Sequence, residues 1–328
     1  MDIQELLIMA LTKKASDLHL STDLAPLLRI DGELCNADLP KLNEQEILNL
    51  LEPMMSRQQR QVFSSQLELD FSFALAHGPR VRVNLFRQFR GLSAVFRIIP
   101  ETIPTLQALG VPSIVSEIMK LSPGLVLVAG PAGSGKSTTL AALIDNLNEN
   151  YCYHVITIED PIEFVHASKN CLISQREVQK HTLHVNKALR AALREDPNVL
   201  VIGELRDAQT IRLAMTAAET GHFVLGSLHA LSAAKTIHRI IDAFSFEERG
   251  RVRAQLAESL QMVVAQTLVK KKEGGRVLAC EIMRSTPAIR HLIREDKVAQ
   301  LYSFIQTGQA QGMQTFEQHL ERLAPQLA

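Results

Sequence analysis

The sequence predicts a two-domain protein, in which a mixed α+β domain precedes an α/β domain with a mostly parallel sheet. The chain has 328 residues, enough for two domains at roughly 100–200 residues each. Apolar residues make up 46% and charged residues 21% of the chain, a composition that excludes disordered and collagen-like proteins. Beyond residue 116, continuous apolar segments alternate with helical patterns, which is typical of a parallel sheet buried on both faces.

Residues 1–100 predict the mixed α+β domain. Apolar spacing over 3–11 predicts an amphipathic helix. Asn43 predicts the N-cap of a second helix that reaches residue 55, with Glu46 at the capping-box position. Strand patterns occur at 17–20, 27–30, 81–85 and 93–98.

Prolines at 100, 104 and 112 predict an interdomain linker over 101–115. The α/β domain is expected to span 116–285. Its predicted strands are 125–129, 154–158, 199–202 and 223–227. Its predicted helices are 136–148, 186–195, 208–220 and 247–266. Residues 286–328 are expected to form a C-terminal helical segment.

Charge and composition exclude several function classes. The chain carries 35 basic and 35 acidic residues, and this balance argues against nucleic acid as a partner, because nucleic-acid binders normally carry a basic excess. No apolar segment reaches the ~20 residues that span a bilayer, so no direct membrane insertion is expected. The four cysteines are widely spaced, which disfavours a zinc module. We therefore expect a cytoplasmic protein.

Residues 130–138 read GPAGSGKST and match the phosphate-binding pattern G-x-x-x-x-G-K-[ST] between a strand and a helix. Glycines allow backbone N–H groups to surround an anion, and the helix N-terminus adds positive potential. Lys136 is expected to reach the β- and γ-phosphates, and the Ser137 hydroxyl to bind Mg²⁺. The nucleotide-binding candidates are Gly130, Pro131, Ala132, Gly133, Ser134, Gly135, Lys136, Ser137 and Thr138.

Acidic residues follow two predicted strands, as hydrolysis requires beside the phosphates. Glu204 follows VLVIG and occupies the position of a Walker B acid, where Asp is more common. Glu163 ends the segment EDPIE after the strand at 154–158. His222 and His229 bracket the next strand, and His229 leaves the edge of the sheet at which both acids are expected.

Five arginines and no acid lie between Asp70 and Glu101. They are Arg80, Arg82, Arg87, Arg90 and Arg97. One interpretation is a solvated basic strand face. The other is an arginine finger, a cation that reaches a triphosphate bound by a neighbouring subunit. The pattern alone leaves both open.

Four segments in order, GPAGSGKST, ITIEDPIEF, VLVIGELRD and AAETGHFVLGSLHA, resemble the secretion-type AAA+-like motor ATPases. Two more, SDLHL near the start and AIRHLIREDKVAQ near the end, make the chain similar to the type IV pilus (twitching motility) retraction ATPases. This resemblance implies a PAS-like N-terminal domain, a RecA-like ATPase domain and a homo-hexameric ring. It also implies that ATP lies between the two domains, in a site completed by a neighbouring subunit.

The same resemblance implies roles for particular residues. Glu163 would be the catalytic base and Glu204 the Mg²⁺-side acid. His222 and His229 would link phosphate state to domain position, and Arg82 and Arg97 would act in trans. The implied partner is an inner-membrane platform protein at the pilus base, which would place the protein at the cytoplasmic face of that membrane.

Three residues depart from the usual family pattern: Ala132, Ala230 and His291. None removes a phosphate ligand or a catalytic acid, but they leave open a paralogue with a modified mechanical role. Pilus-assembly and type II secretion ATPases normally carry an N-terminal extension and a tetracysteine module, which this sequence does not show. A RecA-type nucleic-acid translocase and a nucleotide-binding module without turnover are the remaining alternatives.

Overall fold

The computed structural model describes residues 2–75, 78–99, 102–120 and 123–327. The chain divides into two compact units, Met1–Thr102 and Ile103–Ala328, which we describe separately. No helix in the described part of the chain combines the length and the apolar character needed to cross a membrane.

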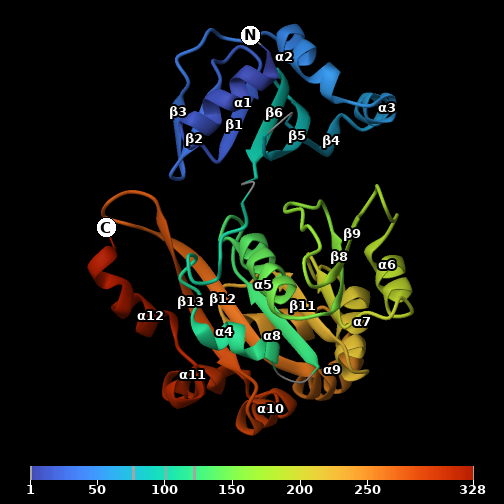
Figure 1. Cartoon of the computed structure of the whole chain (residues 1–328), viewed down its shortest axis with the longest axis vertical. Helices are drawn as coiled ribbons and strands as arrows, with labels where there is room; N and C mark the ends of the chain where they lie inside the picture. The colour runs from blue at the N-terminus through green and yellow to red at the C-terminus, as the bar shows by residue number, and fades with distance from the viewer. Residues whose placement is uncertain (1, 76–77, 100–101, 121–122, 328) are drawn as a thin grey trace. The chain divides into compact units, whose positions relative to one another are not determined.

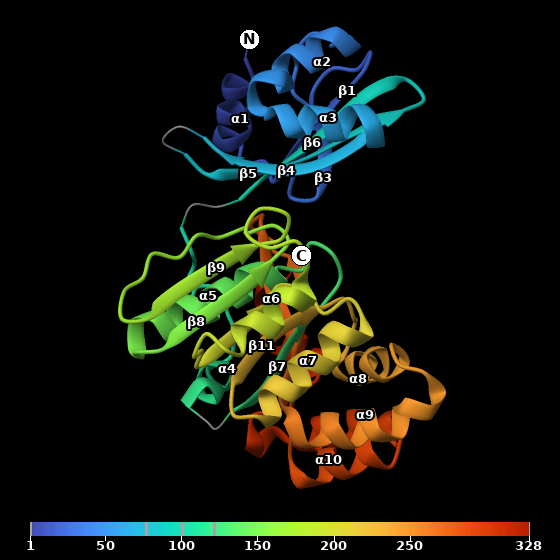
Figure 2. The same cartoon turned by 90° about the vertical axis from the view of Figure 1, so that its right-hand side faces the viewer.

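The first unit contains an antiparallel sheet of six strands in the order β3-β2-β1-β6-β5-β4. The strands are β1 (Asp17–Ser21), β2 (Leu27–Ile30), β3 (Glu33–Asn36), β4 (Glu68–Ala74), β5 (Arg80–Gln88) and β6 (Gly91–Ile98). Helices α1 (Ile3–Thr12), α2 (Glu44–Leu51) and α3 (Arg57–Gln66) lie on one face of this sheet, as Figure 2 shows. The sheet therefore has one face buried beneath helices and a second, more polar face.

The second helix of this unit begins as the sequence predicts. Glu46 N donates to Asn43 Oδ1 at 2.9 Å, and Asn43 N donates to Glu46 Oε2 at 2.7 Å, which is a capping box. The α-helix ends at Leu51 and not at residue 55, because Pro53 lacks a backbone N–H and a short 3₁₀ turn follows. Strands β3 and β4 and helix α3 were not expected.

The second unit is built on a seven-stranded sheet in the order β13-β12-β7-β11-β10-β8-β9 (Figure 1). All neighbouring strands are parallel except β12 and β13. The strands are β7 (Gly124–Ala129), β8 (His154–Glu159), β9 (Leu172–Glu177), β10 (Val199–Ile202), β11 (Phe223–Leu228), β12 (Leu260–Lys270) and β13 (Arg276–Arg284). This confirms the α/β class and the mostly parallel sheet.

Helices cover both faces of this sheet. On β7, Val126 and Val128 pack in one core with α4 (Ser113–Glu117) and α5 (Lys136–Asn150). Leu125 and Leu127 point to the other face and pack in a core with the remaining large helices. These are α6 (Val185–Ala192), α7 (Ala208–Glu219), α8 (Ala233–Asp242), α9 (Phe246–Ser259), α10 (Pro287–Arg294) and α11 (Leu301–Thr307). Continuous apolar strands are thus explained by burial on two sides.

Three expectations about this unit need correction. The helix predicted over 247–266 ends at Ser259, and the β-branched run that follows forms β12, which pairs with β7. Residues 103–115 are part of this unit and not a linker, because Leu106 and Val115 are buried in its core. Residues 286–328 are helical as predicted, with α10, α11 and α12 (Phe316–Leu323); the correction is that they are not separate from the α/β domain, because Ile293 of α10 lies in the same core as the sheet.

Candidate nucleotide-binding site

The glycine-rich segment forms a loop between β7 and α5, as its sequence predicts. Gly133 and Gly135 have φ angles of 73° and 86°, a left-handed conformation that glycine adopts without a steric penalty. Helix α5 begins at Lys136, and no side chain caps its N-terminus. The first N–H groups of the helix are therefore available to an anion.

A residue that the sequence did not single out supports this loop. Gln266 on β12 is buried, and its Nε2 donates to Ser134 O at 2.8 Å. A Cβ atom at Gly130 would overlap Gln266 O and the Ser134 Oγ. At Gly133 nothing lies within 4 Å of a Cβ position. The two glycines thus serve different needs, close approach to β12 at Gly130 and a left-handed turn at Gly133.

Gly130→Ala is expected to lower the free energy of unfolding by about 1–3 kcal/mol, because the added methyl group must displace backbone that is packed against β12. Gly133→Ala meets only the backbone penalty of its φ angle, about 1–2 kcal/mol, and is the matched control. Urea unfolding of both variants, with binding of a fluorescent ATP analogue, measures the two effects. An unchanged unfolding midpoint for Gly130→Ala would contradict the close contact.

Lys136 is held within the loop by three polar contacts. Its Nζ donates to Gly130 O and Pro131 O, both at 2.9 Å, and lies 3.3 Å from His229 Nδ1. Burial lowers the pKa of Lys136, whereas the charges of Glu204 and Glu163 act to raise it. The lysine, His229 and both predicted acids therefore form one electrostatic cluster.

Glu204 connects this cluster to the neighbouring strand end. Its Oε1 lies 3.3 Å from His229 Nε2, and Arg206 Nε donates to its Oε2 at 2.8 Å. The Arg206 Nη1 lies 3.4 Å from Asp160 Oδ2. Ser137, exposed in the first turn of α5, and Glu204 both offer oxygen atoms, which Mg²⁺ prefers. These donors fit the expected magnesium ion.

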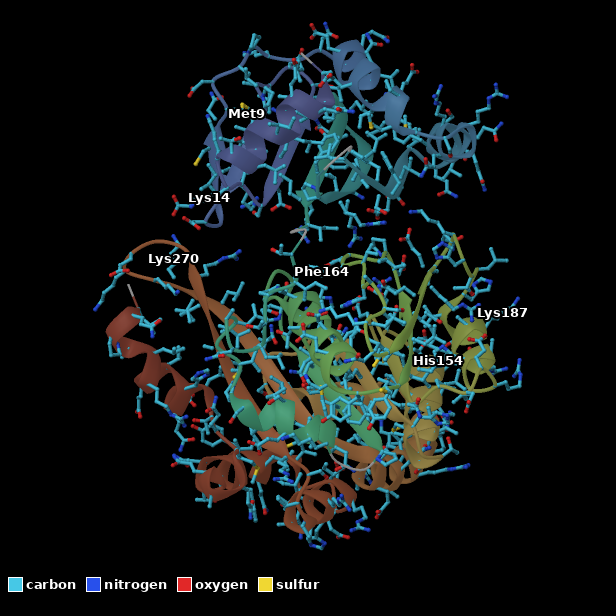
Figure 3. The ribbon with its side chains drawn as sticks, in the orientation of Figure 1. Met9, Lys14, His154, Phe164, Lys187 and Lys270 are labelled. Atoms are coloured by element: carbon cyan, nitrogen blue, oxygen red, sulfur yellow. The ribbon has the colours of Figure 1, made fainter. Side chains whose placement is uncertain are left out.

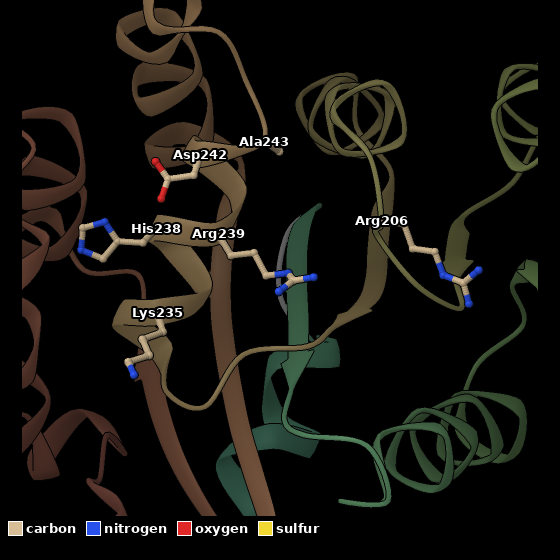
Figure 4. Close-up of a pocket in the computed structure, with 6 residues that line it drawn as sticks. All are labelled: Arg206, Lys235, His238, Arg239, Asp242 and Ala243. Carbon is tan, nitrogen blue, oxygen red and sulfur yellow. The ribbon is translucent and has the colours of Figure 1, made fainter.

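Arg206 also lines an open pocket of about 500 Å³ on the other side of its loop (Figure 4). The pocket residues are Arg206, Lys235, His238, Arg239, Asp242 and Ala243, five of them from α8 and the residue after it. Asp242 is paired with Arg249 at 3.2 Å. Arg206 is thus paired with Glu204 and Asp160 and also borders a surface with an excess of basic side chains.

Glu163 lies in the loop after β8, close to a second acid. Glu159, the last residue of β8, accepts hydrogen bonds from Thr157 Oγ1 at 2.6 Å and from the backbone N–H of Glu163. Burial raises the pKa of Glu159 to about 6, against the effect of these hydrogen bonds. The carboxyl group of Glu159 is therefore part of the support of the Glu163 loop.

The raised pKa of Glu159 has a consequence for stability. An acid that is harder to ionise in the folded state makes the protein less stable as pH rises through its unfolded and folded pKa values. Between pH 4.5 and 6.5 we expect Glu159 to lower the free energy of unfolding by about 2 kcal/mol. In Glu159→Gln this part of the pH dependence should disappear. Urea unfolding at several pH values, compared between wild type and variant, measures it; equal pH dependence would contradict the assignment.

The structure does not bring every predicted residue to this site. His222 precedes β11 and lies at the opposite edge of the sheet, where its Nδ1 is 3.0 Å from Ala217 O. The six residues of β11 separate it from His229 by roughly 20 Å. Within this unit, His222 is therefore not brought together with Lys136, Glu204 and His229, and its expected role in linking phosphate state to domain position stays a prediction. His222 lines a separate pocket of about 240 Å³ with Tyr153 and Asn198.

Arg82 and Arg97 lie in the first unit and are directly opposite each other on β5 and β6. Arg97 Nε donates to Asp17 Oδ1 at 2.9 Å, and Arg82 Nε lies 3.7 Å from Asp70 Oδ1. The Arg97 side chain is 54% exposed although Asp17 is 6% exposed. Both arginines are thus held at the sheet surface by acids of their own unit, with the Arg97 side chain more than half open to solvent.

Comparison with known proteins identifies the family. A family model described as type II/IV secretion system protein matches residues 1–322. The chain belongs to this family. The type IV pilus retractation ATPase PilT of Pseudomonas aeruginosa is 55% identical over 323 residues, which are 98% of this chain and 94% of that protein. A twitching motility protein of Neisseria gonorrhoeae is 51% identical, covering 92% and 81% of the two chains.

A solved structure of a family member matches the whole fold. The crystal structure of the pilus retraction motor PilT with bound ADP covers 100% of this chain and 94% of its own, with a TM-score of 0.88 and 43% identity. The family resemblance predicted from the sequence motifs is therefore confirmed.

Proposed function

We propose that this protein is a motor ATPase that drives type IV pilus retraction and that it works as a ring of six copies. The observation that carries the proposal is the cluster of Lys136, His229, Glu204 and Glu163 at one edge of the parallel sheet. The similarity of the whole chain to relatives named as a retraction ATPase and a twitching motility protein supports the same assignment.

ATP is the substrate in this proposal. The loop at 130–138 holds the phosphates through backbone N–H groups, and Lys136 exchanges its contacts with Gly130 O and Pro131 O for phosphate oxygens. Glu163 accepts a proton from the attacking water. Ser137 and Glu204 would hold Mg²⁺, which, when bound, neutralises charge on the phosphates. His229, between Lys136 and Glu204, is placed to change partners as the phosphates change.

Each site is completed in trans in this proposal. Arg82 and Arg97 of a neighbouring subunit stabilise the charge that develops on the transferred phosphoryl group. The work is done on an inner-membrane platform protein, which positions the ring at the cytoplasmic face of that membrane.

Phosphate release measured across a range of protein concentrations tests this proposal. If catalysis needs a neighbouring subunit, specific activity falls when the protein is diluted below the concentration at which rings assemble. Size-exclusion chromatography with light scattering gives that concentration independently. Specific activity that stays constant on dilution would contradict the proposal that a neighbouring subunit completes the site. Single-stranded DNA is the control ligand, and stimulation by it would instead favour a nucleic-acid translocase.

A further inference from the structure

The loop that carries Glu163 is tied to β9 at several backbone positions. Ile162 N donates to Glu177 Oε2 at 3.2 Å, and Glu177 is buried. Gln175, two residues earlier on β9, forms hydrogen bonds with the backbone of Phe164 and His166 in the same loop. Phe164, which is labelled in Figure 3, directly follows Glu163 and carries one of the Gln175 attachments. Glu163 is therefore flanked by attachments on both sides.

Gln175 makes two of these attachments with the two ends of one amide group. Its Nε2 donates to Phe164 O at 2.9 Å, and its Oε1 accepts from His166 N at 2.8 Å. A backbone carbonyl only accepts and a backbone N–H only donates. The orientation of the Gln175 amide is therefore fixed by its partners, and only a group with a donor and an acceptor satisfies both.

The same amide makes a third contact, with the acid at the end of β8. Gln175 Nε2 also donates to Glu159 Oε1 at 3.0 Å. Glu159 accepts the backbone N–H of Glu163 as well. Gln175 thus joins β8, β9 and the segment that follows Glu163 in one hydrogen-bond network, which reaches the Glu163 backbone N–H through Glu159.

We propose that Gln175 is a positioning residue for Glu163, which fixes the loop so that the Glu163 carboxylate is held ready to accept a proton from water. This inference rests on the proposed ATPase function. The side chain acts through the backbone of the loop and not through contact with substrate. We expect loss of the network to leave the phosphate-binding loop intact, because none of these three Gln175 hydrogen bonds involves residues 130–138.

Gln175→Leu keeps the approximate size of the side chain and removes all three hydrogen bonds. We expect kcat for phosphate release to fall about 10- to 100-fold, since small misplacement of a catalytic group has effects of this size. The KM for ATP and the affinity for a fluorescent ATP analogue should stay within about twofold. Gln209→Leu is the matched control, because its side chain accepts from Asn186 Nδ2 on the surface of the same unit.

The variant Gln175→Glu allows a second test, the pH dependence of kcat, which should not change if Gln175 only stabilises the fold. A carboxylate at this position still accepts from His166 N, but it has no proton to donate to Glu159 Oε1 or to the carbonyl of Phe164. When protonated it regains a donor, so kcat relative to wild type at the same pH should rise several-fold from pH 8 to pH 6. Two titratable neighbours have to be considered. Burial lowers the pKa of His166 to about 4, so this histidine stays neutral over that range. Burial raises the pKa of Glu159 to about 6, so its protonation toward pH 6 also supplies a proton between the two carboxyl groups and acts in the same direction.

The outcomes separate this inference from the function on which it rests. If wild type releases no phosphate with Mg²⁺·ATP, the proposed function fails. If wild type turns over and Glu163→Gln does not, but Gln175→Leu retains kcat within twofold of wild type, the positioning role alone is overturned. A pH-independent ratio of Gln175→Glu to wild type would overturn it as well. Thermal melts of each variant identify any loss of activity that is caused by unfolding.

Discussion

Replacing Glu163 by glutamine is expected to lower kcat for phosphate release by about 10²- to 10⁴-fold, the usual contribution of a general base. Glutamine has the shape of glutamate but cannot accept a proton from water. The loop should keep its conformation, because its attachments to Glu159 and Gln175 use the backbone of the loop and not the Glu163 side chain. Binding of a fluorescent ATP analogue should therefore persist while turnover is lost.

The matched control for this variant is Glu149→Gln. Glu149 is an acid of the same unit whose carboxylate pairs with Lys169 at 2.9 Å on the surface, so its loss should leave kcat unchanged. The measurement is steady-state phosphate release at saturating Mg²⁺·ATP and at a ring-forming protein concentration. Turnover by Glu163→Gln within a factor of ten of wild type would show that another group activates water.

Replacing Arg97 by alanine is expected to lower kcat by about 10³-fold or more, the effect of removing an arginine finger. Mixing two inactive variants distinguishes a residue that acts in trans from one that acts in its own subunit. Arg97→Ala and Glu163→Gln, each inactive alone, should regain activity together, because about a quarter of the interfaces in a randomly mixed ring carry both intact residues. No such recovery is possible if Arg97 and Glu163 serve the same site from one chain.

Arg97→Ala also leaves Asp17, a buried acid, without its ion pair, so its thermal stability has to be measured beside its activity. Arg87→Ala is the matched control. Arg87 lies on the neighbouring strand β5 and pairs with Glu44 at 2.9 Å at the surface, and its removal should affect neither stability nor turnover by much. A mixture that stays inactive although mixed rings form would refute the assignment of Arg97 in trans.

Much of the phosphate site could be predicted from the sequence because its residues follow strand ends. A parallel sheet brings the carboxyl ends of its strands to one edge, so Lys136, Glu163, Glu204 and His229 were expected together. The same rule places His222 apart from these four residues, because it comes before its strand and not after it.

The supporting residues could not be predicted in this way. Gln266 lies on β12, although the sequence pattern predicted a helix there. A short apolar run fits a buried strand and a buried helix equally well, so periodicity cannot distinguish the two. Gln175 lies on β9, whose residues are mostly half-buried and polar. Contacts such as that of Gln175 with Phe164 depend on how two segments meet in space, and the spacing of residues along the chain contains no information about it.

The contacts of Lys136 have a thermodynamic consequence for ligand affinity. Its ammonium group already has two carbonyl partners and an imidazole in the free chain. A phosphate that binds here replaces these contacts instead of meeting a solvated charge. The contribution of Lys136 to the heat of ligand binding is therefore the difference between the bonds that it breaks in the free chain and those that it forms with phosphate oxygens.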